Sequence, residues 1–185
     1  MRSRGGLFGL VGAAAAALVA ATAAGAATIT VNATVSTGST LSVSSLNSPS
    51  FSLTLNGDDQ TGTYQSQLQV VDARGLATGG GWNLTIGATQ FSDGAGHTLP
   101  STADSISSVT SACHSGSTCT LPTNSVSNTN LAIPVSPTTS KFLNAATATG
   151  LGRVDVNVNV NVVVPANAIA ATYSSTLTIA VATGP

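Results

Sequence analysis

Residues 68–86, LQVVDARGLATGGGWNLTI, decide the fold of this chain, because two alternating segments flank a glycine-rich turn at Gly79–Gly81. Apolar and polar residues alternate before the turn and again after it. A period of two that includes β-branched and aromatic residues is typical of a half-buried β-strand. We therefore expect strands over residues 64–72 and 82–88, and we expect these two strands to pair as a hairpin.

The longest alternating run lies further along the chain, at residues 154–162, VDVNVNVNV. Every second residue is valine, so one face of the strand is buried and the other is wet or hydrogen-bonded. A helix would spread these valines over its whole surface, and β-branched residues disfavour a helix. Pro165 ends the predicted strand.

Shorter alternating segments and turn signals fill the rest of the chain. Further strands are predicted at residues 28–35, 41–43, 51–55, 106–109, 130–134 and 173–182. Asn56–Asp59 carries the Asn-Gly signal of a tight turn, and the glycines of Phe91–His97 predict a loop. Pro134 suits an edge strand better than a central one. Many short strands separated by turns favour an all-β fold, a two-sheet antiparallel β-sandwich of Ig-like or barrel-like form.

Residues 1–26 have the pattern of a cleaved signal peptide, so we exclude them from the predicted fold. A basic start with Arg2 and Arg4 precedes an alanine-rich apolar run, and the small residues Ala24–Ala26 suit cleavage. Cleavage one residue later fits equally well. The apolar run is shorter than the roughly 20 residues that a stable bilayer span needs. Residues 27–185 are then expected to form one exported domain with no membrane span.

The mature chain is almost uncharged. Residues 27–185 keep three of the five Lys and Arg residues together with all six Asp, and they contain no Glu. This composition excludes a basic nucleic-acid surface and a disordered acidic tail. A surface of Ser, Thr, Asn and Gln suits an extracellular β protein that packs against polymers or against copies of itself.

Two cysteines, Cys113 and Cys119, lie close together after the predicted signal peptide. In an exported chain they are expected to form a disulfide, which stiffens one surface loop. A metal site that combines both thiols with His114 is the alternative, although no second pair of ligands accompanies it.

The sequence offers little for catalysis. His97 and His114 are the only histidines, and no Gly-x-Ser-x-Gly motif is present. The absence of Glu leaves a glycosidase only aspartates for its carboxylate pair. Asp58–Asp59, or Asp93 with His97, could hold calcium, but neither has the ligand spacing of a calcium loop. We predict a non-enzymatic protein with no catalytic residue, no metal site and no cofactor.

Two parts of the chain carry a family resemblance. Asp72–Gly75, a short glycine loop and then Trp82–Leu84 resemble the proximal motif of the WxL domain. That family occurs on Gram-positive cell surfaces and is associated with non-covalent attachment to peptidoglycan. The tail resembles the distal part of the domain through Pro165–Asn167, Tyr173, Ser175–Val181 and Gly184–Pro185. Ile179 stands where the distal tryptophan would be, and Val181 stands where the leucine would be.

The resemblance covers residues 28–185 and implies a function. It implies a secreted cell-surface protein that binds wall peptidoglycan non-covalently, with the C-terminal strand near the proximal motif. The wall-binding or ligand-binding residues that it implies are Trp82, Leu84, Asp72, Arg74, Ile179 and Val181. The alternative is a structural surface subunit that assembles with itself or with a larger surface protein. The long Val/Asn strand at residues 154–162 supports this alternative, since it could pair at a sheet edge.

Trp82, the only tryptophan, has two interpretations. A surface-facing indole can lie flat on a sugar ring, whereas a buried one plugs an end of the sandwich. Asp72 and Arg74 also have two. They line a ligand-binding rim, or they form a structural ion pair in which Arg74 can also lie over the indole as a cation–π contact.

Overall fold

The computed structural model describes residues 32–36, 38–76 and 80–185, and the chain divides into two units, Met1–Val35 and Ser36–Pro185. The predicted signal peptide at residues 1–26 lies outside the described residues. So do residues 28–31 of the first predicted strand, and residues 32–35 are exposed and form no strand. All eight strands described below belong to the second unit.

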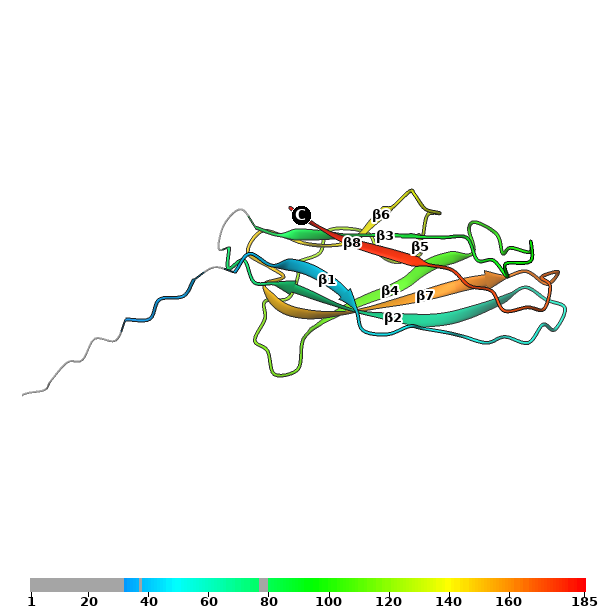
Figure 1. Cartoon of the computed structure of the whole chain (residues 1–185), viewed down its shortest axis with the longest axis horizontal. Helices are drawn as coiled ribbons and strands as arrows, with labels where there is room; N and C mark the ends of the chain where they lie inside the picture. The colour runs from blue at the N-terminus through cyan, green and yellow to red at the C-terminus, as the bar shows by residue number, and fades with distance from the viewer. Residues whose placement is uncertain (1–31, 37, 77–79) are drawn as a thin grey trace, which may run out of the picture. The chain divides into compact units, whose positions relative to one another are not determined.

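The second unit is an all-β sandwich of two antiparallel sheets, which confirms the predicted fold class (Figure 1). The strands are β1 (Leu41–Ser45), β2 (Gln60–Asp72), β3 (Trp82–Ala88), β4 (Asp104–Cys113), β5 (Leu131–Ala132), β6 (Ser140–Ala145), β7 (Gly152–Val164) and β8 (Leu177–Thr183). One sheet has the order β1-β2-β7-β4-β5, and the other has the order β6-β3-β8. In the part of the chain that the structure describes, no helix has the length and hydrophobicity needed to span a membrane.

Strand β7 is the centre of the larger sheet. Its alternate valines from Val154 to Val162 are fully buried and belong to the hydrophobic core. It pairs with β2 on one side and with β4 on the other. The prediction that this Val/Asn strand could pair at a sheet edge is therefore wrong, because neighbouring strands already occupy both of its edges.

The predicted hairpin between β2 and β3 is also wrong. Strand β2 pairs with β7 over its whole length, from Gln60 opposite Val164 to Asp72 opposite Gly152. Six of the seven residues of β3 are buried, and this strand lies centrally in the other sheet, between β6 and β8. The glycine-rich connection thus crosses between the two layers instead of turning within one.

The C-terminal strand does lie beside the proximal motif, as the resemblance implied. Strand β8 pairs with β3 in a register that sets Trp82 opposite Thr183 and Leu84 opposite Val181 (Figure 1). The two motifs, which are about a hundred residues apart in sequence, are therefore direct neighbours in one sheet.

The alternating segment at residues 51–55 forms no strand, contrary to the prediction. Phe51 packs its ring against Tyr64, with ring centroids 6.3 Å apart and planes 11° from parallel. Gly62 makes room for this ring, because a Cβ there would overlap the ring atoms Cδ2 and Cε2 of Phe51. Side-chain packing against β2 therefore holds the segment where backbone pairing was expected.

Three further predicted strands and the predicted disulfide are present in the structure. The strand expected at residues 106–109 is part of the longer β4, and the edge strand expected at residues 130–134 is present as the short β5. Strand β8 covers most of the strand predicted at residues 173–182. Cys113 and Cys119 form the predicted disulfide, with their Cα atoms 5.5 Å apart.

Candidate functional site

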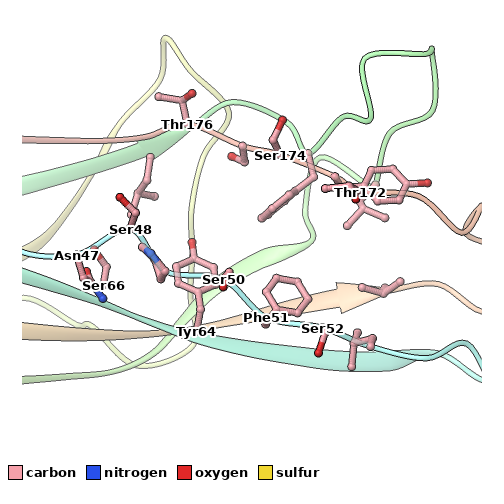
Figure 2. Close-up of a pocket in the computed structure, with 18 of the residues that line it drawn as sticks. Asn47, Ser48, Ser50, Phe51, Ser52, Tyr64, Ser66, Thr172, Ser174 and Thr176 are labelled. Atoms are coloured by element: carbon pink, nitrogen blue, oxygen red, sulfur yellow. The ribbon is translucent and has the colours of Figure 1, made fainter.

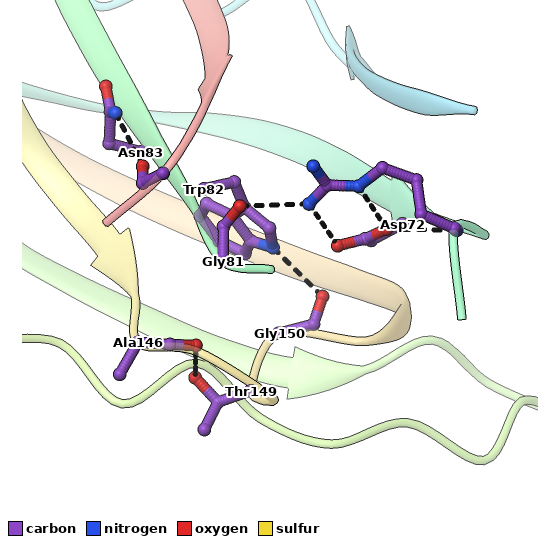
Figure 3. A network of polar contacts seen from close by, with 9 residues as sticks. Asp72, Gly81, Trp82, Asn83, Ala146, Thr149 and Gly150 are labelled. Carbon is purple, nitrogen blue, oxygen red and sulfur yellow. Dashed lines mark hydrogen bonds and ion pairs between the residues drawn. The ribbon is translucent and has the colours of Figure 1, made fainter. Parts of the chain in front are cut away.

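Trp82 is at the start of β3 and is fully buried. Its indole N–H donates a hydrogen bond of 3.0 Å to the carbonyl oxygen of Gly150 (Figure 3). A buried indole has no free face for a sugar, so the stacking interpretation of Trp82 is corrected to that of a core plug.

Two glycines make this packing possible. Gly150 has a φ of +69°, and a Cβ there would lie 2.5 Å from Trp82 Nε1 and 2.6 Å from the Ala145 Cβ. Gly81 has a φ of +95°, and a Cβ there would lie 2.6 Å from the carbonyl oxygen of Ala145. Only glycine adopts both the backbone conformation and the close approach without strain.

Asp72 and Arg74 form the structural ion pair beside this plug. Arg74 donates to both carboxylate oxygens of Asp72, through Nε at 2.9 Å and Nη2 at 2.7 Å, and Nη2 also donates to the Gly81 carbonyl at 2.9 Å (Figure 3). Burial raises the pKa of Asp72, but the hydrogen bonds and charge of Arg74 outweigh burial, so this pKa lies below its usual value. The pair thus ties the end of β2 to the start of β3.

The C-terminus joins the same network. The Gly184 N–H donates to the Gly81 carbonyl at 3.1 Å, and the Asn83 side chain donates to the Gly184 carbonyl at 2.8 Å. Leu84 is fully buried, whereas Ile179 and Val181 are half-buried against the core. Of the six predicted binding residues, only Arg74, Ile179 and Val181 keep exposed surface, and direct wall contact by any of them stays a prediction.

A large groove opens between the two sheets, where β1 and β8 form the sheet edges. It has a volume of about 1180 Å³. One wall is the segment after β1 together with β2, and the other is the segment that leads into β8 (Figure 2). Ile179 is the one predicted site residue that lines it.

Aromatic rings and hydroxyl groups line this groove. Its aromatic residues are Phe51, Tyr64, Phe91 and Tyr173. Phe51 stacks on Tyr64 and meets Phe91 edge to face, with centroids 6.5 Å apart. The labelled hydroxyl residues on the two walls are Ser48, Ser50, Ser52 and Ser66, and Thr172, Ser174 and Thr176 (Figure 2).

The groove lining contains no charged side chain among the described residues. Apolar walls with a few well-placed polar groups are typical of ligand sites, and aromatic faces with nearby hydroxyls suit an uncharged, polyhydroxylated ligand. Sequence reasoning missed this site. Its walls come from residues 43–68 and 164–179 together with Phe91 and Leu99, and no local pattern in any of these segments indicates the others.

Both histidines and three further aspartates have structural partners, since His97 contacts Asp93, His114 contacts Asp155, and Asp59 accepts from a loop N–H. Asp93 accepts hydrogen bonds from the backbone N–H groups of Ala95 and His97, so it closes its own loop. Asp59 accepts from the Ala166 N–H at 2.8 Å. Within the described ranges, no three His, Cys, Asp or Glu side chains gather in a way that could hold a metal ion.

Asp104 is the one buried carboxyl with an oxygen that has no hydrogen-bond partner among the described residues. Burial raises the pKa of Asp104 to about 6. Burial also raises the pKa of Tyr64, and the charge of Asp104 adds to that increase. The carboxylate form is therefore disfavoured in the folded protein. Ionisation of Asp104 therefore lowers the unfolding free energy. This loss is absent below the ordinary pKa of 3.8, grows as the pH rises towards 6, and stays constant at higher pH.

Asp104→Asn is expected to remove this pH-dependent loss. When the pH is raised from 3.5 to 7, the variant should gain about 2 kcal/mol of unfolding free energy relative to the wild type. Urea denaturation at these two pH values measures the difference. An equal difference at both would show that the carboxyl does not titrate in this range.

The comparison with known families agrees with the geometry of the two motifs. Residues 51–185, more than half of the chain, match the family described as WxL domain surface cell wall-binding. No curated protein and no solved structure matches the chain. The matched segment contains the Trp82 network and both walls of the groove from Phe51 onward. This chain therefore belongs to the WxL domain surface cell wall-binding family.

Proposed function

We propose that this protein binds the glycan strands of peptidoglycan without a covalent bond and without cleaving them, and that the groove is the binding site. As a member of its family, the protein is an extracellular, wall-associated surface protein. The observation that carries the proposal is the uncharged groove with its aromatic rings and hydroxyls. The proposed binding residues are therefore those of the groove, which a polymer can reach, and not the buried Trp82.

The chemistry of the groove fits the backbone of such a glycan. Sugar rings present apolar C–H faces and hydroxyl edges. The groove presents the half-buried rings of Phe51, Tyr64 and Tyr173 with serine and threonine hydroxyls around them. Covering a charged side chain with an uncharged ligand costs free energy, because the charge loses its water. A neutral lining avoids this desolvation penalty. The lack of charge argues equally against cleavage, because the groove lining contains no carboxylate that could act as acid or nucleophile.

Tyr173→Ala should weaken binding to isolated peptidoglycan at least tenfold, which corresponds to about 1.4 kcal/mol. Tyr173 is half-buried in the groove wall, and its hydroxyl donates to the Ile169 carbonyl at 2.9 Å. Co-sedimentation of the purified protein with wall fragments at several salt concentrations measures the affinity.

Tyr173→Phe is the matched control, since it removes the hydroxyl but keeps the ring. This variant should sediment like the wild type if the ring makes the contact. Equal sedimentation of Tyr173→Ala and the wild type would contradict the groove as the site. Steady release of soluble sugar fragments by the wild type would contradict the non-enzymatic role.

Association with other surface proteins or with a second copy stays a prediction. Three exposed apolar side chains at the groove, Leu53, Leu55 and Ile169, are the surface that such a partner could cover. Light scattering of the purified protein over a range of concentrations tests self-association directly.

A further inference from the structure

We propose that the outer face of the β1-β2-β7-β4-β5 sheet is a second wall-binding surface, one that takes neutral glycan strands lying flat. The inference rests on the proposed function but concerns a different part of the molecule. It starts from the polar residues that alternate with the buried residues of β2, β7 and β4.

These polar residues form ranks across three strands. The registers place them side by side as Thr63–Asn161–Ser105, Gln65–Asn159–Ser108 and Gln67–Asn157–Thr110. Successive ranks are two residues apart along β2 and β7, which is roughly 7 Å, and neighbouring strands are about 4.8 Å apart. In β4 a register shift between Ile106 and Ser108 adds one residue between the first two ranks. The face is thus a regular grid of amides and hydroxyls.

Hydrogen bonds within the grid hold its side chains in place. Gln65 Nε2 donates to Asn159 Oδ1 at 3.0 Å, and Asn159 Nδ2 donates to Ser108 Oγ at 2.8 Å. Gln67 Nε2 donates to Gln65 Oε1 at 3.1 Å. Ordered side chains lose less conformational entropy when they bind a partner than free ones do.

Three asparagines in β7 argue for a role beyond folding. Asn is depleted in β-strands, yet Asn157, Asn159 and Asn161 occupy the most central strand of the larger sheet. Threonine at these three positions would also expose a polar group, and it has a higher β-strand propensity than asparagine. Residues that break a local rule in this way tend to mark functional sites.

The chemistry of the grid selects its partner. Each amide offers both a donor and an acceptor, which matches the hydroxyls and N-acetyl groups of a wall glycan. The three ranks contain no charged and no large apolar side chain, so they offer nothing to an anionic polymer or an apolar protein surface. Exposed Val163 lies beyond one end of the grid, and Asp155 with its partners Gln69 and His114 lies beyond the other.

The triple variant Asn157→Thr, Asn159→Thr, Asn161→Thr tests the inference. It should bind isolated peptidoglycan at least fivefold more weakly than the wild type, while its melting temperature stays equal or rises. The variant Asn128→Thr is the control, because Asn128 is in a loop outside the three strands of the grid and does not line the groove. This control should sediment like the wild type.

A soluble probe separates this surface from the groove. Short N-acetylglucosamine oligomers should bind both surfaces. The triple variant and Tyr173→Ala should therefore each weaken binding of the oligomers, and the combined variant should weaken it further than either change alone. If the wild type binds neither wall nor oligomer, the proposed function fails and this inference fails with it. The inference alone fails if the triple variant sediments like the wild type, if its melting temperature falls together with its binding, or if it changes oligomeric state.

Discussion

Gly150→Ala is expected to destabilise the domain by about 3–8 kcal/mol. A Cβ at this position would lie 2.5 Å from the Trp82 indole nitrogen and 2.6 Å from the Cβ of Ala145, in a part of the core with no free surface. Overpacking of this kind costs about 1–3 kcal/mol, and the positive φ adds about 1–2 kcal/mol. Displacement of the Gly150 carbonyl would also leave the buried indole N–H without its acceptor, at about 1–3 kcal/mol.

The measurement can use the only tryptophan of the chain. In the wild type, the buried Trp82 should emit at short wavelength and resist quenching by acrylamide, and urea unfolding should shift the emission. Gly94→Ala is the matched control, because Gly94 has a φ of +74° but a Cβ there would have no neighbour within 4 Å. That control should lose only about 1–2 kcal/mol. Equal losses in the two variants would show that contact with the indole does not matter.

Arg74→Ala should destabilise the protein by about 3–5 kcal/mol at neutral pH, because it leaves the fully buried Asp72 carboxylate without a counter-charge. It also removes the bond to Gly81, which links β2 to β3. Arg74→Lys should recover only part of this loss, since an ammonium group cannot reproduce the paired bonds of the guanidinium. Arg153→Ala is a surface control with an expected change of less than about 0.5 kcal/mol.

The pH dependence of this loss follows from Asp72. In the wild type its pKa is lowered, so its stabilisation is present above the unfolded pKa and disappears as the pH falls through the folded value. In Arg74→Ala only the hydrogen bond from the backbone N–H of residue 74 still opposes burial. We expect burial to outweigh it and to raise this pKa, so the variant loses stability as the pH rises above about 4. The difference between the two proteins should therefore be small at acidic pH and largest at neutral pH.

Denaturation of four proteins forms the test: wild type, Arg74→Ala, Asp72→Asn and the double variant. The double variant should be more stable than Arg74→Ala at neutral pH, because a neutral amide is easier to bury than a lone carboxylate. If the two single losses simply add, Asp72 and Arg74 do not form a coupled pair.

The fold class could be predicted because period-two patterns report burial directly. The valines of β7 show which face is buried, but they cannot show whether the strand is central or at an edge. That depends on the strands that reach its two sides, β2 and β4, which lie far away in sequence. The hairpin prediction failed for a related reason, since a nine-residue glycine-rich connection permits both a turn and a crossing between layers.

The candidate site shows the same limit. The sequence drew attention to Trp82, Asp72 and Arg74, and the structure does bring them together, but as a buried clamp. Whether an aromatic ring is exposed depends on what packs over it, here the Gly150 loop. The groove joins two segments with ordinary Ser/Thr-rich sequences, so only the folded chain reveals it.

The wide sequence spacing of the strand pairs has a kinetic consequence. Gln60 pairs with Val164, and Trp82 pairs with Thr183, so each sheet closes over a loop of about a hundred residues. Sandwiches dominated by such distant pairings fold in milliseconds to seconds, far more slowly than proteins with local contacts. A chain leaving a secretion pore could therefore complete neither sheet until its final third, which contains β7 and β8, had emerged.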